Sequence, residues 1–338
     1  MALKKKSAKK SSKKEKLVIG IDLGGTNVFS VLVTEKGKIL AEKHFPTMGA
    51  NGPDFVIKNI ADNVKEMVES AGYSLKQVWR AGVGSPGPLD SKKGIIMGAV
   101  NLPGWTHVKL KDKLEKLLGV KVGVDNDANC AVYGEKWLGA AKGAKNVVGL
   151  TLGTGVGGGL IVDGVMVRGA NYNAAEIGHI SLDPMGRKCK CGALGCFEQY
   201  ASASAIAESA RERIRKGAKS IVTEMVKGDL NKVTSKTVFE AMDSGDKTAR
   251  ETWEEFITYL AAGTANTMNF MNPEVVVIAG GVINAGDKLF KPLREAVRKQ
   301  TFELIFNAAK IVPAKLGERA GALGAAGVVI LEGDYYGL

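Results

Sequence analysis

The sequence predicts an α/β fold built from two similar halves with a ligand cleft between them. Strand-like apolar runs alternate with amphipathic helical segments along most of the 338 residues, as in α/β proteins. A strand, a glycine turn and a second strand near the start are restated about 130 residues later, at 147–164. A prior of ~150 residues per domain also favours two domains, and a cleft between similar halves is a common ligand site.

The first half opens with three strand-like runs. "KLVIGIDL" leads into a double glycine, and "VFSVLV" and "KILAEKHF" follow with a turn signal between them, which predicts an antiparallel meander. Residues 53–71 carry apolar side chains at helical spacing with Gly72 as a stop, which predicts an amphipathic helix. A strand entering "GVGSPGPLD", a helix near 111–118 and a strand in "VKVGVDND" complete this half.

The second half repeats the strand–turn–strand segment and adds more helix. We predict helices at 202–215, 247–271 and 286–300, with strands in "EVVVIAGG" and "KIVPAKL". The last predicted element is an apolar helix in "AGALGAAGVVIL".

The net charge of +12 is concentrated in the first residues. Residues 1–16 carry eight lysines and one glutamate, so they hold +7 and leave about +5 for the other 322 residues. This segment lacks apolar periodicity, which predicts a disordered lysine-rich tail. A solubilising leader is our first interpretation of it, and contact with a polyanion is the second. The rest of the chain does not favour a nucleic-acid partner.

No segment of the sequence has the apolar core of a signal peptide or the ~20 uninterrupted apolar residues of a membrane span. We therefore expect a cytoplasmic protein without membrane contact. Disulfides are disfavoured in that reducing compartment, yet three of the four cysteines lie within eight positions, 189–196. Such clustering indicates a metal site or a catalytic thiol.

Two glycine turns, at 24–25 and 153–158, are candidates for binding phosphate. Glycine lets successive N–H groups point into one concavity, and threonine hydroxyls can add donors. Asp22 ends the first strand and would hold a magnesium ion through water. Tight turns without a ligand are the alternative, but their occurrence as a pair favours phosphate. The predicted nucleotide-binding residues here are Asp22, Gly24, Gly25, Thr26, Asn27, Gly153, Thr154, Gly155 and Gly157.

Other nucleotide motifs fit the sequence less well. "GTGVGG" matches G-x-G-x-x-G, but a dinucleotide fingerprint must lead into a helix, whereas a predicted hairpin follows here. The G-x-x-x-x-G-K-[ST] pattern of a P-loop is missing from the sequence. Gly280 and Gly281 end a buried strand before a helix, where they would flank an adenine and ribose.

Five motifs stand in one order along the chain: "IDLGGTN", "NDAN", "LGTGVGGG", "EIGH" and "CKCGALGCFE". Together they resemble the ROK family of bacterial sugar kinases and repressors over residues 17–331. The resemblance implies a two-domain actin-like ATPase fold, also called ribonuclease H-like, with an interdomain cleft. It also implies that the last helix returns to the first domain. We therefore expect a small α/β domain at 17–125 plus about 322–338, and a large α/β domain with a zinc-binding loop at 126–321.

The resemblance also explains the clustered cysteines. Cys189, Cys191 and Cys196 give C-x-C-x₄-C, and His179 lies ten residues before the first of them, as in the family's structural zinc site. Bound zinc would tie the "EIGH" segment to the segment that carries Glu198. Incidental reduced cysteines are the alternative.

By the same resemblance, Asp127 is the catalytic base that accepts a proton from a sugar hydroxyl during phosphoryl transfer. The start of a helix would keep its carboxylate ionised; a role as a helix N-cap is the alternative. Gly84 would shape the cleft floor. The implied substrate-binding residues are Gly84, Asn101, Asn126, Asp127, Glu176, His179 and Glu198.

These features favour an ATP- and magnesium-dependent hexokinase that makes glucose 6-phosphate. Kinases for mannose, fructose, N-acetylglucosamine or N-acetylmannosamine share much of the scaffold and stay open, as does polyphosphate as the donor. A sugar-responsive regulator of the same family usually carries a helix-turn-helix ahead of this region. Only about 20 residues precede Asp22, so we expect an enzyme. The family also leads us to expect a homodimer or homotetramer.

Overall fold

The computed structural model describes residues 15–99 and 101–338. The predicted disordered tail lies outside the described residues except for its last two positions. The first sheet has the strand order β3-β2-β1-β4-β8, in which β1–β3 are antiparallel and β4 and β8 run parallel to β1. Its strands are β1 (Leu17–Leu23), β2 (Asn27–Thr34), β3 (Ile39–Pro46), β4 (Val78–Ser85) and β8 (Lys121–Asn126).

The second sheet has the same plan, in the order β11-β10-β9-β12-β13. Again three strands form an antiparallel meander, and two further strands add in parallel to its first strand. The predicted repeat is therefore present in the topology, and the predicted α/β fold class is confirmed. The strands are β9 (Val147–Leu152), β10 (Val156–Val162), β11 (Val165–Met166), β12 (Val275–Ala279) and β13 (Lys310–Pro313).

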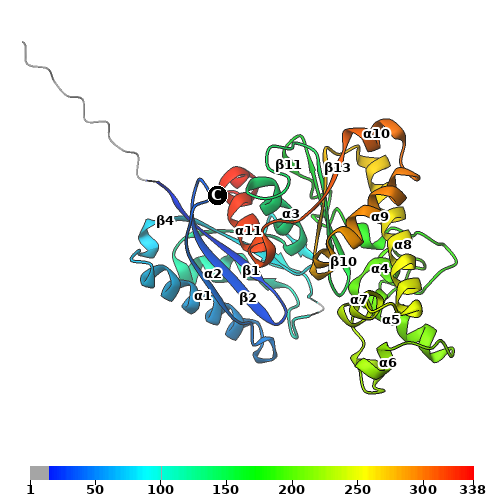
Figure 1. The fold of residues 1–338 in the computed structure, drawn as a ribbon. Coiled ribbons are helices and arrows are strands. Elements are labelled where there is room, and N and C mark those ends of the chain that lie inside the picture. Colours follow the sequence, from blue (N-terminus) through cyan, green and yellow to red (C-terminus); the bar gives the residue numbers. More distant parts are fainter. Residues whose placement is uncertain (1–14, 100) are drawn as a thin grey trace, which may run out of the picture.

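Two helices lie between the sheets (Figure 1). Helix α3 (Asp127–Trp137) follows β8, and helix α11 (Ala320–Leu331) follows β13, so they hold equivalent places in the two halves. They approach closely because they meet at glycines: a Cβ atom at Gly134 would collide with the carbonyl oxygen of Ala320, and one at Gly324 with that of Cys130.

The last helix also packs on the first sheet. A Cβ atom at Gly20 in β1 would collide with the carbonyl oxygen of Ala322, and one at Gly82 in β4 with that of Ala325. This contact supports the expected return of α11 to the first domain, and the exact domain boundaries stay a prediction.

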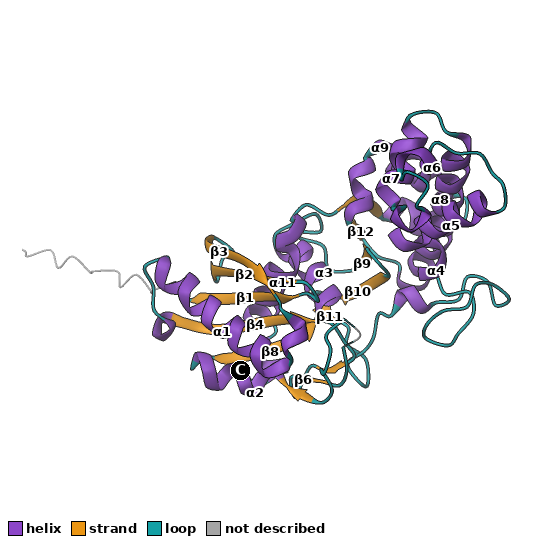
Figure 2. Cartoon of the chain, turned by 90° about the horizontal axis from the view of Figure 1, so that it is seen from below, coloured by secondary structure: helices purple, strands orange, loops and turns teal. Residues whose placement is uncertain are grey.

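The remaining helices cover the outer faces (Figure 2). Helix α1 (Pro53–Ser70) buries the predicted apolar face against the first sheet, together with α2 (Leu110–Leu118). Beyond the second sheet, helices gather at one end of the molecule. They are α4 (Glu198–Ala201), α5 (Ala203–Arg215), α6 (Val222–Met225), α7 (Ser235–Asp243), α8 (Lys247–Met271), α9 (Asp287–Arg298) and α10 (Glu303–Ala308).

Several short elements were not predicted. Helices α6, α7 and α10 are among them, as is a three-stranded sheet of β5 (Leu89–Asp90), β6 (Ile95–Ile96) and β7 (Val108–Lys109). In the part of the chain that the structure describes, every helix is too short or too polar to cross a membrane.

Candidate active site

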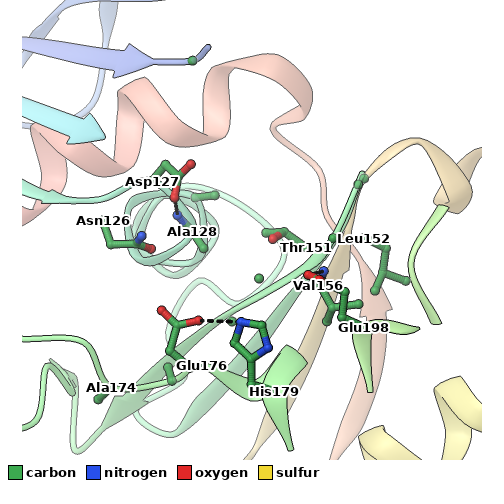
Figure 3. Close-up of a pocket in the computed structure, with 18 of the residues that line it drawn as sticks. Asn126, Asp127, Ala128, Thr151, Leu152, Val156, Ala174, Glu176, His179 and Glu198 are labelled. Carbon is green, nitrogen blue, oxygen red and sulfur yellow. Dashed lines mark hydrogen bonds and ion pairs between the residues drawn. The ribbon is translucent and has the colours of Figure 1, made fainter. Parts of the chain in front are cut away.

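A cavity of about 530 Å³ lies where the two halves meet, and segments from both of them line it. The turn after β1, the first turn of α3, the β9–β10 turn and the loop before α4 all contribute (Figure 3). Most of the predicted site residues therefore come together at one place. Those lining the cavity are Asp22, Gly24, Asn126, Asp127, Gly153, Gly155, Gly157, Glu176, His179, Glu198 and Gly280.

The other predicted residues lie nearby or elsewhere. A Cβ atom at Gly25 would lie 2.9 Å from Cβ of Asn101, so the first glycine turn and the Asn101 loop are in contact. A Cβ atom at Gly84 would lie 3.5 Å from Cα of Asp127, which puts this glycine behind the cavity wall. Thr26, Asn27, Thr154 and Gly281 are not among the residues that line this cavity.

The first turn of α3 presents Asp127 to the cavity. Asn126 is the N-cap, with extended backbone, and its side chain accepts a hydrogen bond of 3.1 Å from the amide of Asn129. Asp127 is the first helical residue, and its carboxylate accepts a 2.8 Å hydrogen bond from the amide of Ala128. Because Asn126 performs the capping, the carboxylate of Asp127 is available for another role.

Burial raises the pKa of two aspartates that line the cavity, Asp127 and Asp22. Burial raises the pKa of Asp127, while hydrogen bonds from the backbone amides of Ala128 and Asp127 and from the Asn126 side chain offset part of that rise. Burial and the neighbouring charge of Asp127 raise the pKa of Asp22 to about 7. The helix start thus stabilises the charge of Asp127 as expected, but burial has the larger effect. A raised pKa makes this carboxylate a stronger base than a solvated one.

The β9–β10 turn is bonded to the segment that carries Glu198. The carboxylate of Glu198 accepts a 3.0 Å hydrogen bond from the amide of Val156, and the amide of Ala203 donates to the carbonyl of Gly153 at 2.9 Å. A Cβ atom at Gly155 would collide with the Glu198 carboxylate, so any other residue there would displace that carboxylate. The predicted phosphate turn and a predicted sugar ligand are therefore in direct contact.

A second cavity, of about 450 Å³, lies next to Gly281. Phe239 on α7 and Trp253 on α8 form its aromatic wall, with ring centroids 5.2 Å apart. Sequence reasoning identified only the glycine pair at this place, since it did not find α7. The lining residues are Ser235, Lys236, Phe239, Glu240, Trp253, Gly281, Val282, Asn284 and Ala285.

The cysteine cluster is assembled as a metal site. One ligand atom from each of His179, Cys189, Cys191 and Cys196 lies within 4.8 Å of all the others. Sγ of Cys191 and Sγ of Cys196 are 3.6 Å apart, close to the roughly 3.8 Å expected for two thiolates on a tetrahedral zinc with ~2.3 Å bonds. Three thiols and one imidazole thus fit zinc in number, chemistry and spacing.

His179 divides its two ring nitrogens between this cluster and the cavity. Nδ1 lies 3.8 Å from Sγ of Cys189, whereas Nε2 lies 4.0 Å from the Glu176 carboxylate at the cavity wall. The side-chain amide of Gln199 also donates to Sγ of Cys189, at 3.5 Å. The cluster therefore joins the Glu176 loop to the segment just before α4, whose first residue is Glu198.

Known proteins resemble this chain in both fold and sequence. The ROK family profile matches residues 18–331. A glucokinase from Thermotoga maritima is 40% identical over 92% of this chain and 96% of its own length. A ROK family glucokinase from Streptomyces griseus, solved with glucose and AMPPNP, is 34% identical with a TM-score of 0.76 over 92% of this chain and 98% of that chain. A ROK hexokinase from Thermus thermophilus is 31% identical with a TM-score of 0.81 over 94% and 99%. The chain therefore belongs to the ROK family.

Proposed function

We propose that the protein is an ATP-dependent glucokinase, which transfers the terminal phosphoryl group of ATP to the 6-hydroxyl of glucose. The observation that carries this proposal is the carboxylate of Asp127, which faces a cavity between two glycine turns without serving as the N-cap of its helix. The glucokinase relatives and the structure with glucose and AMPPNP support the choice of glucose and ATP.

Asp127 would act as the general base. A sugar hydroxyl is a weak nucleophile, so a carboxylate accepts its proton as the bond from oxygen to phosphorus forms and the bond to the departing ADP breaks. The pKa of Asp127, raised by burial, brings this group closer to the operating pH. Asp22 lies in the same cavity and would hold a magnesium ion through water, which neutralises phosphate charge when bound.

The hexose would lie between the first turn of α3 and the "EIGH" loop. Asn126, Glu176, His179 and Glu198 line that side of the cavity, and Asn101 packs against Gly25, the neighbour of the lining residue Gly24. Amides and carboxylates suit sugar hydroxyls because each can bond to neighbouring hydroxyls at once. A sugar lacking one hydroxyl would leave a polar group unpaired, which gives such sites their selectivity.

The nucleotide would extend from the glycine turns to the second cavity. Phe239 and Trp253 offer aromatic surface for a base, and Gly281 lets the backbone approach the ribose. Polyphosphate has no group that would fill this aromatic cavity, so the presence of the cavity favours ATP as the donor.

Zinc bound by the cysteine cluster would have a structural role. It would fix the Glu176 loop relative to Glu198, and with four protein ligands it would have no open position for substrate.

The resulting enzyme would be cytoplasmic. The homodimer or homotetramer expected from the family stays a prediction that sedimentation of the purified chain can test.

A panel of sugars and donors tests the proposal. Glucose, mannose, fructose, N-acetylglucosamine and N-acetylmannosamine are each supplied with ATP or polyphosphate, and both ADP and phosphosugar are detected directly. We expect glucose with ATP to give the highest kcat/KM. A higher value for another hexose or for polyphosphate would replace that part of the assignment. Turnover with none of them, together with tight sugar binding, would favour a sugar-responsive regulator.

A further inference from the structure

A largely buried group of three charged side chains and one tyrosine lies directly behind the junction of β8 and α3. Its members are Asp125, Arg168, Glu332 and Tyr336, of which Asp125 is 1% exposed and Arg168 is 5% exposed. None of the four lines the cavity, although Asp125 immediately precedes Asn126 and Asp127. The established features of the site therefore do not explain why these charges are buried here.

The carboxylate of Asp125 is bonded on both of its oxygens. Oδ1 accepts hydrogen bonds from the backbone amide of Asn126 at 2.8 Å and from the side chain of Asn129 at 3.0 Å. Oδ2 accepts from Nε of Arg168 at 2.7 Å and from the hydroxyl of Tyr336 at 2.5 Å. All of its acceptor positions are thus used. Oδ1 fixes the junction of β8 and α3, and Oδ2 is fixed by Arg168 and Tyr336.

The two groups that hold Asp125 come from distant parts of the chain. Arg168 lies just beyond β11 in the second half, and Tyr336 lies in the segment after α11. Nη2 of Arg168 donates to the Tyr336 hydroxyl at 2.7 Å, and Nη1 donates to the Glu332 carboxylate at 2.6 Å. Glu332 in turn accepts from the amide of Met166 at 3.0 Å. The cluster therefore connects the junction, the second sheet and the last segment of the chain.

Stability alone is a weak reason for such a cluster. Removing charges from water is costly, and well-packed apolar residues of similar volume often stabilise a fold equally well or better. What hydrogen-bonded charges add is fixed geometry, because each bond constrains both direction and distance. In this protein the group so constrained is the backbone from which Asn126 and Asp127 project.

We propose that Arg168 and Tyr336 are positioning residues for phosphoryl transfer, which act by clamping Asp125 and so fix Asn126 and Asp127 against the hexose. This inference rests on the proposed kinase function. Neither residue lines the cavity, so their loss should lower kcat more than it raises KM. A displacement of ~1 Å at a reacting group can cost about a hundredfold in rate, and loss of one of several bonds should cost less.

Adjacent tyrosines provide a matched test. Tyr336→Phe removes the hydroxyl that bonds to Asp125, whereas Tyr335→Phe removes a hydroxyl that bonds to Ser91 at 2.7 Å and not to Asp125. Both changes delete one oxygen from the same segment and keep the ring. We expect Tyr336→Phe to lower kcat about tenfold with both KM values within twofold of wild type, and Tyr335→Phe to leave kcat within twofold.

Arg168→Lys sharpens the test, because it keeps the positive charge but loses the fork that bonds Asp125, Glu332 and Tyr336 together. We expect kcat to fall further than in Tyr336→Phe, with thermal unfolding recorded to confirm that each variant is folded. Amide hydrogen exchange of the segment 121–130, measured without ligands, should be faster in Tyr336→Phe and unchanged in Tyr335→Phe.

The exchange measurement separates this inference from the proposed function. If wild type fails to phosphorylate glucose, the function is wrong, yet faster exchange in Tyr336→Phe alone would still support the clamp. Equal exchange at 121–130 in both tyrosine variants, or equal kcat in both where wild type is active, would overturn it.

Discussion

Helices α3 and α11 follow equivalent strands of the two sheets, yet their first turns carry different chemistry. The first turn of α3 has an asparagine cap and the acidic Asp127 facing the cavity. The first turn of α11 has no side-chain cap, and at Gly321 it lies so close to the Asp22 carboxylate that a Cβ atom would collide with it. Helix α3 thus presents its own carboxylate, that of Asp127. Helix α11 instead leaves room for the carboxylate of Asp22, which comes from β1 of the first sheet.

This difference shows how a repeated fold can build an asymmetric site. The two helices pack through Gly134 and Gly324, and Asp22 of β1, which lies against the first turn of α11 at Gly321, lines the same cavity as Asp127. The second half alone adds the cysteine cluster that holds the Glu176 and Glu198 segments together, within the residues that the structure describes. The following predictions test which of these differences matters most for the proposed activity.

The largest effect is expected at the first turn of α3. Asp127→Ala removes the proposed base and should lower kcat by about 1,000-fold, since a positioned acid–base group contributes roughly 10²–10⁴. Glucose binding, followed by calorimetry, should remain measurable because the other ligands stay in place. Comparable turnover in variant and wild type would count against Asp127 as the base.

A smaller loss is expected at the first turn of α11. Gly321→Ala places a methyl group against the Asp22 carboxylate and should lower kcat about ten- to hundredfold through displacement of that group. A double-mutant cycle is the control: in an Asp22→Asn background, Gly321→Ala should cost little more. Full additivity of the two losses would mean that the glycine acts through something other than Asp22.

The cysteine cluster should affect sugar binding more than chemistry. Cys191→Ser, verified by elemental analysis to lower zinc content, should raise KM for glucose about tenfold, because loss of support for a ligand typically costs 10–100-fold. Cys130→Ala is the matched control, since Cys130 is buried on α3 away from the cluster. A zinc-free preparation with unchanged rate and sugar affinity would refute the structural role.

The smallest effect concerns stability and its dependence on pH. The pKa of Asp22 is raised from 3.8 to about 7, so folding favours the protonated carboxyl. Its contribution to stability is complete below the unfolded pKa and is lost as pH rises through about 7. Without magnesium, Asp22→Asn should therefore become more stable than wild type as pH increases through about 7. A difference in unfolding free energy between Asp22→Asn and wild type that stays the same at all pH values would contradict the raised pKa.

Long elements with clear end signals could be predicted from the sequence. The predicted helix 247–271 matches α8, whose apolar positions are regular and whose Asp246 caps the amide of Ala249. The glycine turns and the Cys₃His set were also recognisable, because each depends on residues close in sequence. The meeting of the two glycine turns at one cavity then follows from the repeated topology.

Features made by distant partners could not be predicted. Helix α7 is nine residues long, and the aromatic cavity that it forms needs Trp253 and Gly281 from other segments. The bond between Glu198 and the Val156 amide joins residues 42 positions apart. The Asp125 clamp spans 211 positions to Tyr336, and Arg168 has no motif around it that would indicate its partner.

The most direct test of the central claim is a structure of the protein with glucose and a non-hydrolysable ATP analogue. We predict a carboxylate oxygen of Asp127 within about 2.6–3.2 Å of the glucose O6, with the terminal phosphoryl group on the other side of that oxygen and held by the glycine turns. A closed complex in which Asp127 points away from O6, or in which another side chain occupies that position, would contradict the account.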